Sequence, residues 1–330
     1  MTTMRAPDFW RHDGTMARLL SPLSPLYDVA AKFGRAATSA HRVGVPVVCV
    51  GNLVAGGAGK TPTALAVAQL LLELDRAPHF LSRGYGGREV GPLEVVPERH
   101  DARRVGDDAL LLARRAPTWV ARDRVAGAMA AIAAGADCIV MDDGFQNPSL
   151  VKDLSLLVVD RDYGFGNGRL LPAGPLRETV AGGMARADAV VLIEGTMPGR
   201  DPAPPPGIVD RPLLRARLLP TGRDEPLAGG AVVAFAGIGR PEKFFETLVA
   251  MGLEVVEGHR FADHHLYDSD EIMRLVEAAG QRRAHLVTTA KDFVRLPAEA
   301  RQMVAVVEVE LIFETPAAVL ALLAGAFPDG

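Results

Sequence analysis

Short apolar runs recur along the chain and predict the strands of a buried sheet. They lie at residues 45–50, 137–141, 189–193, 231–236 and 286–289, and a segment with helical periodicity at 63–74 follows the first run. The runs are continuous rather than alternating, which is typical of parallel strands covered on both faces. The pattern therefore indicates an α/β protein built on a mostly parallel sheet.

The same pattern divides the chain in two. A proline-rich stretch at 202–206 follows the run at 189–193, and the run at 231–236 begins a second α/β-like set that continues to 304–309. Domain boundaries usually fall in such linkers. We expect a large domain at residues 1–225 and a smaller C-terminal domain at 226–330. We leave open whether a late strand at 304–313 pairs back across the linker.

Composition narrows the class of protein. The 330 residues are 48% hydrophobic, enough to bury one large core or two smaller ones, and the net charge of −4 gives no sign of a nucleic-acid surface. Cys49 and Cys138 stand in apolar runs and are expected as core residues of a protein in a reduced compartment. Charges near the N-terminus interrupt any signal-peptide core, and proline, asparagine and glycines break the longest uncharged run, 43–59, so no membrane span is expected.

The N-terminal segment differs in character from the rest of the chain. Residues 1–45 carry six basic and three acidic residues, a net +3, interleaved with apolar side chains. Such a mixture suits the interface of an anionic membrane, and it equally suits an amphipathic helix packed on the core. Pro22 and Pro25 are expected to break the segment into short pieces.

A glycine-rich loop follows the first apolar run and precedes the first helical segment. Strand, loop and helix N-terminus together form the arrangement that cradles polyphosphate, with Lys60 reaching the β- and γ-phosphates and the Thr61 hydroxyl on Mg²⁺. The usual pattern has glycine where Val54 stands, so a glycine-rich turn that binds nothing is the competing interpretation. The predicted nucleotide-binding residues are Ala55, Gly56, Gly57, Ala58, Gly59, Lys60 and Thr61.

Two carboxylates end a second apolar run. Asp142 and Asp143 follow residues 138–141, at the edge of a parallel sheet where ligands bind. A carboxylate in this place holds Mg²⁺ or its water in many P-loop proteins. Alone, an Asp-Asp-Gly sequence after a strand is more often a turn, but beside the Lys60 loop it favours a metal site.

These motifs, taken in order, resemble the tetraacyldisaccharide 4'-kinase family nearly end to end. The family also lacks the first glycine of the loop. This chain departs from the family at Asp108, Asn147 and Ala290, where glutamate, histidine and glutamate are usual. The matching segments are 25–27, 51–62, 82–87, 106–107, 142–146, 166–168, 171–178, 261–264 and 288–292.

The resemblance implies both a fold and an activity. The fold would be a P-loop NTPase-like three-layer α/β/α domain plus a smaller C-terminal α/β lid domain. The activity would be transfer of the γ-phosphate of MgATP to the 4'-hydroxyl of tetraacyldisaccharide 1-phosphate, a lipid A precursor, by a peripheral enzyme at the cytoplasmic face of the bacterial inner membrane. A four-chain lipid leaves a bilayer only at high cost, which favours the interfacial interpretation of residues 1–40. We infer neither a nucleic acid nor an obligate protein partner.

The resemblance also assigns roles to side chains. Asp107 would accept the hydroxyl proton with His264 as its partner from the lid, and Lys60 would stabilise the transferred charge. From the residues alone, Asp107 fits a helix N-cap and His264 an ordinary surface histidine beside His265. The remaining candidates are Thr61, Asp142, Asp143 and Glu178 for the metal, and Arg83 and Arg177 for substrate phosphate.

Two functions of other classes compete with the kinase. An ATPase or GTPase switch would turn over nucleotide without stimulation by a lipid and would not need a proton acceptor at Asp107. The GTPase base-recognition motif is absent, although Thr289-Ala290-Lys291-Asp292 distantly resembles it. A nucleotide-regulated membrane-binding protein would keep its function without Asp107.

Overall fold

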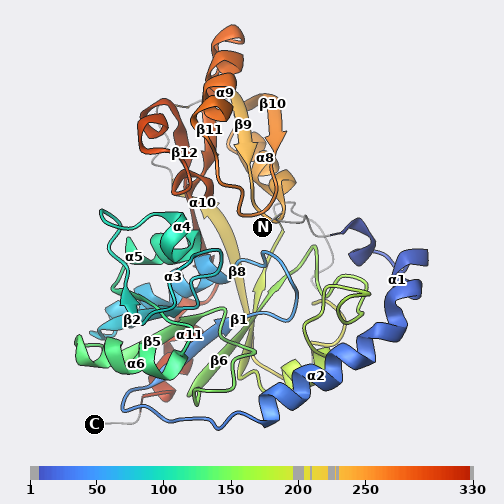
Figure 1. Cartoon of the computed structure of the whole chain (residues 1–330), viewed down its shortest axis with the longest axis vertical. Coiled ribbons are helices and arrows are strands. Elements are labelled where there is room, and N and C mark those ends of the chain that lie inside the picture. Colours follow the sequence, from blue (N-terminus) through green and yellow to red (C-terminus); the bar gives the residue numbers. More distant parts are fainter. Residues whose placement is uncertain (1–6, 196–203, 209, 222–226, 228–229, 328–330) are drawn as a thin grey trace.

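The computed structural model describes residues 7–195, 204–208, 210–221, 227 and 230–327. These residues form two sheets, a large one and a small one that lies above it in the view of Figure 1. The large sheet has the strand order β13-β8-β7-β6-β1-β5-β2-β4-β3 and is parallel except at its two ends. Its strands are β1 (Val47–Gly51), β2 (Pro78–Ser82), β3 (Leu93–Glu94), β4 (Thr118–Val120), β5 (Cys138–Asp142), β6 (Leu154–Asp160), β7 (Ala189–Ile193), β8 (Leu213–Pro220) and β13 (Val309–Phe313).

Helices cover both faces of the large sheet, so the predicted three-layer α/β/α architecture is confirmed. The core on one face joins the sheet to α3 (Lys60–Glu73) and α11 (Pro316–Gly325). The core on the other face includes residues of α6 (Arg124–Ala133) and α7 (Val180–Met184). Two short helices, α4 (Ala102–Val105) and α5 (Asp107–Ala113), form a smaller cluster with β3 and β4. The continuous apolar runs of the sequence are the central strands, buried on both sides.

The small sheet is parallel throughout, in the order β10-β9-β11-β12. One face packs on α8 (Pro241–Ala250), and the other on α9 (Ser269–Gln281) and η4 (Ala298–Met303). The short helix α10 (Ala290–Phe293) points from this unit toward α5. The strands are β9 (Ala231–Ala236), β10 (Glu254–Arg260), β11 (His285–Thr289) and β12 (Ala305–Val307).

The C-terminal end of the chain returns to the large sheet. Strand β13 pairs antiparallel with β8, and Val319 and Leu323 of α11 enter the core on α3. The late strand therefore does pair back, and the span 226–330 is not one unit, because its last strand and helix complete the large domain. The predicted boundary near residue 225 and the first residues of the proline-rich stretch, 202–203, lie outside the described residues.

The N-terminal segment forms consecutive short helical pieces along one side of the molecule (Figure 1). Pro22 and Pro25 stand in the first turns of η2 and α2, where a missing N–H costs nothing. Among the described residues of these pieces only Ala17 and Ser24 are buried, while Leu26 and Phe33 are 70% and 76% exposed. The pieces are η1 (Asp8–Trp10), α1 (Thr15–Leu20), η2 (Ser21–Leu23) and α2 (Ser24–Ala36).

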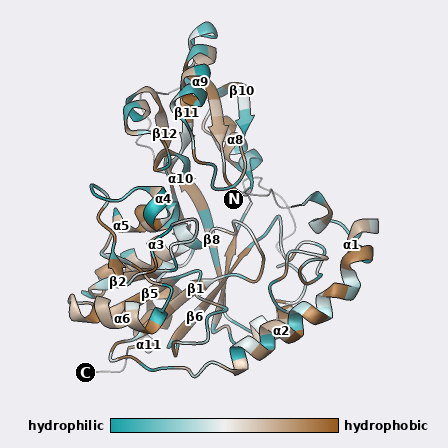
Figure 2. Cartoon of the chain, in the orientation of Figure 1, coloured by the Kyte–Doolittle hydropathy of each residue, from teal (hydrophilic) through white to brown (hydrophobic). Residues whose placement is uncertain are grey.

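Apolar and polar residues alternate along α1 and α2 in Figure 2, unlike the uniformly apolar central strands. The exposed apolar side chains of these helices, such as Leu26 and Phe33, therefore do not pack on the core, whereas Ala17 does. No helix among the residues that the structure describes is both long and apolar enough to cross a bilayer.

Candidate active site

The glycine-rich loop connects β1 to α3, as predicted. Gly59 has φ +83°, and a Cβ there would lie 2.2 Å from Cδ1 of Ile193, so the turn into the helix requires glycine. Val54 is buried and forms an antiparallel bridge with Leu176, and the Ala55 amide donates to the Pro175 carbonyl at 2.8 Å. The missing glycine is thus replaced by a residue that anchors the loop to the segment before Arg177.

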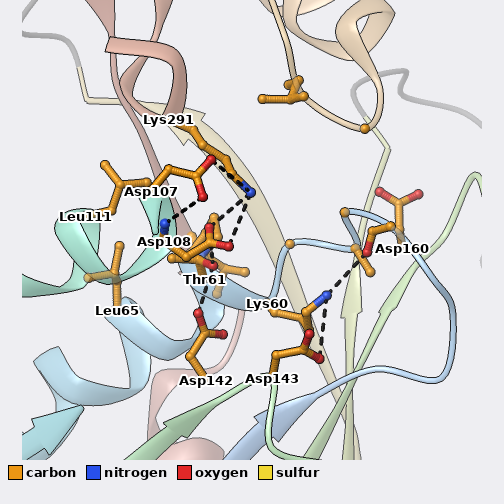
Figure 3. A pocket seen from close by; sticks show the side chains of 18 of the residues that line it. Lys60, Thr61, Leu65, Asp107, Asp108, Leu111, Asp142, Asp143, Asp160 and Lys291 are labelled. Carbon is orange, nitrogen blue, oxygen red and sulfur yellow. Dashed lines mark hydrogen bonds and ion pairs between the residues drawn. The ribbon is translucent and has the colours of Figure 1, made fainter. Parts of the chain in front are cut away.

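Thr61, in the first turn of α3, lies between Asp142 at the end of β5 and Asp108 in the first turn of α5 (Figure 3). Its Oγ1 is 3.0 Å from Oδ2 of Asp142 and 3.1 Å from Oδ1 of Asp108. One hydroxyl has one proton, so it cannot donate to both carboxylates at once. Asp142 Oδ1 is buried without a hydrogen-bond partner in the described part of the chain. Burial and the negative charges of Asp108 and Asp143 raise the pKa of Asp142 to about 7.

Lys291 contacts Asp108, but among the described residues no lysine or arginine is within ion-pair distance of Asp142. The oxygens of Thr61 and Asp142 therefore fit a hard divalent cation such as Mg²⁺. Thr61 and Asp142 are the residues that would hold it, with Asp108 at its side. Asp108 was missed as a site residue, since the sequence showed it only as a departure from the family pattern. The family usually has glutamate at that position, so this chain keeps a carboxylate there. The retained carboxylate was the signal in the sequence that could have identified Asp108 as a site residue.

Asp143 has a different environment from its neighbour. Its Oδ1 accepts from Arg177 Nη1 at 2.9 Å and lies 3.8 Å from Lys60 Nζ. Burial raises the pKa of Asp143, but the charges of Lys60 and Arg177 outweigh it and the net pKa is lowered. Its backbone has φ +53°. Asp142 is therefore the unsatisfied carboxylate of the pair, and Asp143 the paired one.

Glu178 and Arg177 also have partners within the protein. Both oxygens of Glu178, which is 2% exposed, accept from Arg186 at 2.7 and 2.8 Å, and Oε1 also accepts from Gln146 at 3.1 Å. Arg177 contacts Asp143 and Gln146. The metal role of Glu178 and the phosphate role of Arg177 thus stay predictions. Arg177 is paired with Asp143, while Glu178 is bound by Arg186 and Gln146.

Asp107 and His264 come together from the two domains. Nδ1 of His264 lies 2.9 Å from Oδ2 and 3.0 Å from Oδ1 of Asp107, which is 3% exposed. The N-cap interpretation of Asp107 is wrong, because Gly106 occupies that position with φ +88° and Asp107 is the first helical residue. His265 instead binds Glu271 within the small domain, at 3.0 Å. The geometry therefore distinguishes the two adjacent histidines.

Two cations of the small domain complete this cluster. Lys291 Nζ is 3.1 Å from Asp108 and 3.9 Å from Asp107, and the buried Arg295 Nε is 3.4 Å from Asp107. Burial raises the pKa of Asp107, but Lys291, the hydrogen bond and charge of His264, and Arg295 outweigh it, so the net pKa lies well below its usual value. Asp107 is therefore ionised at neutral pH. Sequence reasoning noted Lys291 in the 288–292 motif without a role and missed Arg295.

A second contact joins the domains on the other side of the loop. Asp160, at the end of β6, binds Arg240 and lies 2.9 Å from Lys243 Nζ of α8. A Cβ on Gly239 would lie 3.1 Å from the Gly57 amide, so the small domain directly abuts the glycine-rich loop. A continuous cleft of about 2730 Å³ runs between the domains and is lined by the loop, by Arg83 and by residues of α2.

Comparisons with known proteins agree on one family. Residues 16–327 match the family model described as tetraacyldisaccharide-1-P 4'-kinase. A tetraacyldisaccharide 4'-kinase of Paramagnetospirillum magneticum is 54% identical over 95% of this chain and 96% of that protein. The one from Rhodospirillum rubrum is 53% identical over 97% of each. A crystal structure of LpxK from Aquifex aeolicus in complex with ATP has a TM-score of 0.77 and 26% identity, covering 95% of this chain and 100% of that one.

Proposed function

Since the chain belongs to the tetraacyldisaccharide-1-P 4'-kinase family, we propose that it transfers the γ-phosphate of ATP to the 4'-hydroxyl of a tetraacylated disaccharide 1-phosphate in lipid A biosynthesis. One observation carries the mechanism: Asp107, which contacts His264, lies beside Asp108 and the Thr61 cluster (Figure 3), where the glycine-rich loop would present a nucleotide. Asp108 connects the surroundings of Asp107 with the Thr61 cluster. It contacts Thr61 on one side and, on the other, Lys291, which also lies near Asp107.

The glycine-rich loop would bind the phosphates of the nucleotide. Backbone amides of residues 55–59 and the start of α3 would hold the phosphates of ATP, with Lys60 as the mobile cation. Lys60 now lies 3.3 Å from the Gly56 carbonyl and 3.8 Å from Asp143, contacts weak enough to be exchanged for phosphate oxygens. Bound Mg²⁺ supplies neutralisation of phosphate charge, and Thr61 and Asp142 are the residues that would hold it.

Asp107 is the proposed proton acceptor for the sugar hydroxyl. Its ionised carboxylate is a weak base, which suits phosphoryl transfer because the loose transition state requires little deprotonation before attack. His264 orients the carboxylate through its ring nitrogen. Because His264 belongs to the small domain, the pair is complete only when that domain lies over α5, which limits ATP hydrolysis in the absence of acceptor.

The acceptor also explains the exposed apolar side chains of the N-terminal helices. Leu26, Val29 and Phe33 follow one another at spacings of three and four and are 64–76% exposed, with Lys32 and Arg35 beside them. We propose that α1 and α2 lie in the interface of an anionic membrane, at the cytoplasmic face of the inner membrane, where the lipid acceptor resides. Residues of α2 also line the cleft, so an acceptor could pass from this surface to Asp107.

Transfer of labelled γ-phosphate from ATP to purified tetraacyldisaccharide 1-phosphate in detergent micelles tests the proposal. Label should appear in the lipid with the wild-type protein and nearly vanish with Asp107→Ala. The family membership does not favour a nucleotide switch, which predicts ATP hydrolysis without labelled lipid. That outcome would refute the kinase.

A further inference from the structure

Asn167, from the 166–168 motif, binds the start of the N-terminal segment. It lies in the connection between β6 and α7, residues 161–179. Its backbone amide donates to the Trp10 carbonyl at 2.8 Å, and its Nδ2 donates to the Phe9 carbonyl at 3.1 Å and to the Ala173 carbonyl at 3.0 Å. The side-chain amide thus uses both of its hydrogens, one toward the N-terminal segment and one within the β6–α7 connection.

The backbone geometry beside Asn167 requires this close approach. Gly166 has φ +60°, and a Cβ there would lie 2.6 Å from the Trp10 carbonyl oxygen and 2.6 Å from Cγ of Pro175. The Trp10 ring is held as well, because its Nε1 donates to the Pro172 carbonyl at 3.1 Å. Trp10 is therefore bound to the β6–α7 connection through both its backbone and its side chain.

The N-terminal segment is attached at further points along its length. The buried Ser24, at the start of α2, donates from Oγ to the Leu170 carbonyl at 2.9 Å. Beyond α2, the His41 amide donates to the Ser149 carbonyl at 2.8 Å. Helices α1 and α2 thus lie between fixed points at both ends, which opposes rotation of the helices about a single attachment.

The same connection also binds the glycine-rich loop. The Ala55 amide donates to the Pro175 carbonyl, and the Arg177 amide donates to the Leu53 carbonyl at 2.7 Å. The side chain of Arg177 binds Asp143 at 2.9 Å. One short stretch of chain therefore contacts the N-terminal helices on one side and the predicted phosphate-binding loop on the other.

We propose that Asn167 is a positioning residue, which fixes α1 and α2 relative to the glycine-rich loop so that the acceptor hydroxyl meets the γ-phosphate. The assignment rests on the proposed kinase function and on α1 and α2 as the membrane contact. An acceptor held in a bilayer lies at a depth set by its acyl chains, so the enzyme has to bring its own phosphate to that depth. Misplacement by about 1 Å costs up to about 100-fold in rate.

Three measurements on one set of variants test the positioning role. They are label transfer to acceptor in anionic vesicles, sedimentation with the same vesicles, and ATP affinity by calorimetry without lipid. Asn167→Ala should lower kcat/KM for the acceptor by about 10–100-fold, with vesicle partitioning and ATP affinity each within about threefold of wild type. Such a split is not expected of a merely structural residue, whose loss weakens binding together with transfer.

Two further variants examine the contact from the side of the N-terminal segment. Trp10→Phe keeps an aromatic ring and removes only the donor to Pro172, so it should give the same split with a smaller loss, about 3–10-fold. Thr38→Ala is the control, because the Thr38 hydroxyl is exposed and donates to the Gly34 carbonyl of its own helix. This control should match wild type in all three measurements.

The outcomes separate the positioning role from the kinase itself. Full transfer by Asn167→Ala overturns the proposal. So does a loss of ATP affinity or of vesicle partitioning that accounts for the loss of transfer, because Asn167 then only supports the loop or the membrane surface. If wild type labels no lipid, the proposed function fails. Should Asn167→Ala not fold, Trp10→Phe decides, and unchanged transfer by that variant overturns the proposal.

Discussion

Nδ1 of His264 lies 2.9 Å from Oδ2 of Asp107, although 157 positions separate the two residues in the chain. His264 has φ +58°, a left-handed conformation that a residue with a side chain adopts at a cost. Its amide donates to the Gly237 carbonyl at 3.1 Å, which holds the turn in place. Such strain is typical of residues whose position serves a function. The small domain thus delivers one imidazole to a carboxylate of the large one.

Removal of this imidazole should slow transfer without weakening nucleotide binding. For His264→Ala we expect kcat to fall about 10²–10⁴-fold, the usual contribution of a group that acts in proton transfer, with KM for ATP within about threefold. Transfer of labelled phosphate to micellar acceptor measures both. The matched control is His265→Ala, because His265 contacts Glu271 and not Asp107. Equal losses in the two variants would contradict the assignment of His264.

Asp142 and Asp143 should respond differently to the loss of charge. Asp142 has an unsatisfied buried oxygen, so Asp142→Asn should raise the Mg²⁺ concentration for half-maximal activity by about 10–100-fold. Asp143→Asn should mainly release Arg177 and Lys60, lowering kcat with a smaller change in the Mg²⁺ requirement. Titration of activity with MgCl₂ at fixed ATP separates the two. A larger Mg²⁺ shift for Asp143→Asn would exchange their roles.

The Asp160 contact should make stability depend on pH. Burial raises the pKa of Asp160, but Arg240 and Lys243 outweigh it, so the folded-state pKa lies below the ordinary 3.8. Its stabilisation is therefore complete above the unfolded-state pKa and is lost as the pH falls through the folded-state pKa. Asp160→Asn should lower the free energy of unfolding by about 1.5–3 kcal/mol at pH 7, and the difference from wild type should shrink below about pH 4.

Urea unfolding at pH 7 and at pH 3 measures this difference. Asp75→Asn is the control, because Asp75 is exposed on the surface and asparagine tolerates its left-handed backbone at φ +55°. It should leave stability within about 0.5 kcal/mol of wild type at both pH values. A difference for Asp160→Asn that grows as the pH falls would have the wrong sign for this contact.

Charges placed on the apolar side of α2 should weaken membrane binding. Burial of a leucine or phenylalanine side chain is worth about 1.5–3 kcal/mol, so Leu26→Glu with Phe33→Glu should reduce partitioning onto vesicles with anionic lipid by about tenfold or more. Sedimentation with the vesicles measures it. Met129→Glu is the control, since Met129 is 55% exposed on α6, away from these helices. Unchanged partitioning of the double variant would exclude α2 as the membrane contact.

The sequence predicted the central strands well because burial on both faces leaves a local signal. The runs at 45–50 and 189–193 correspond to β1 and β7, and the glycine-rich loop stands between strand and helix as expected. The pairing of β13 with β8 was left open, since an edge strand of mixed polarity carries little information about a partner some 90 positions away. The chain returns to the large sheet only through the pairing of β13 with β8, and no local sequence pattern reports that pairing.

Part of the candidate site could be assembled from the sequence. The structure brings Asp107 to His264 and Thr61 to Asp142, whose roles stay predictions, while Arg295 and Asp108 were missed. A buried arginine in a helical turn looks like a surface charge in sequence, because only the fold shows what surrounds it.

The pairing of β8 with β13 has a consequence for how the molecule is built. Pro220 stands opposite Val309, and the Thr221 amide donates to the Glu308 carbonyl, so the two strands approach each other as the arms of a hairpin. The small domain is therefore an insertion at the tip of a hairpin. A short turn in place of residues 221–308 would close the large sheet while removing His264, Lys291 and Arg295 together. The glycine-rich loop thus belongs to the large domain, while His264, Lys291 and Arg295 all belong to the segment inserted between β8 and β13.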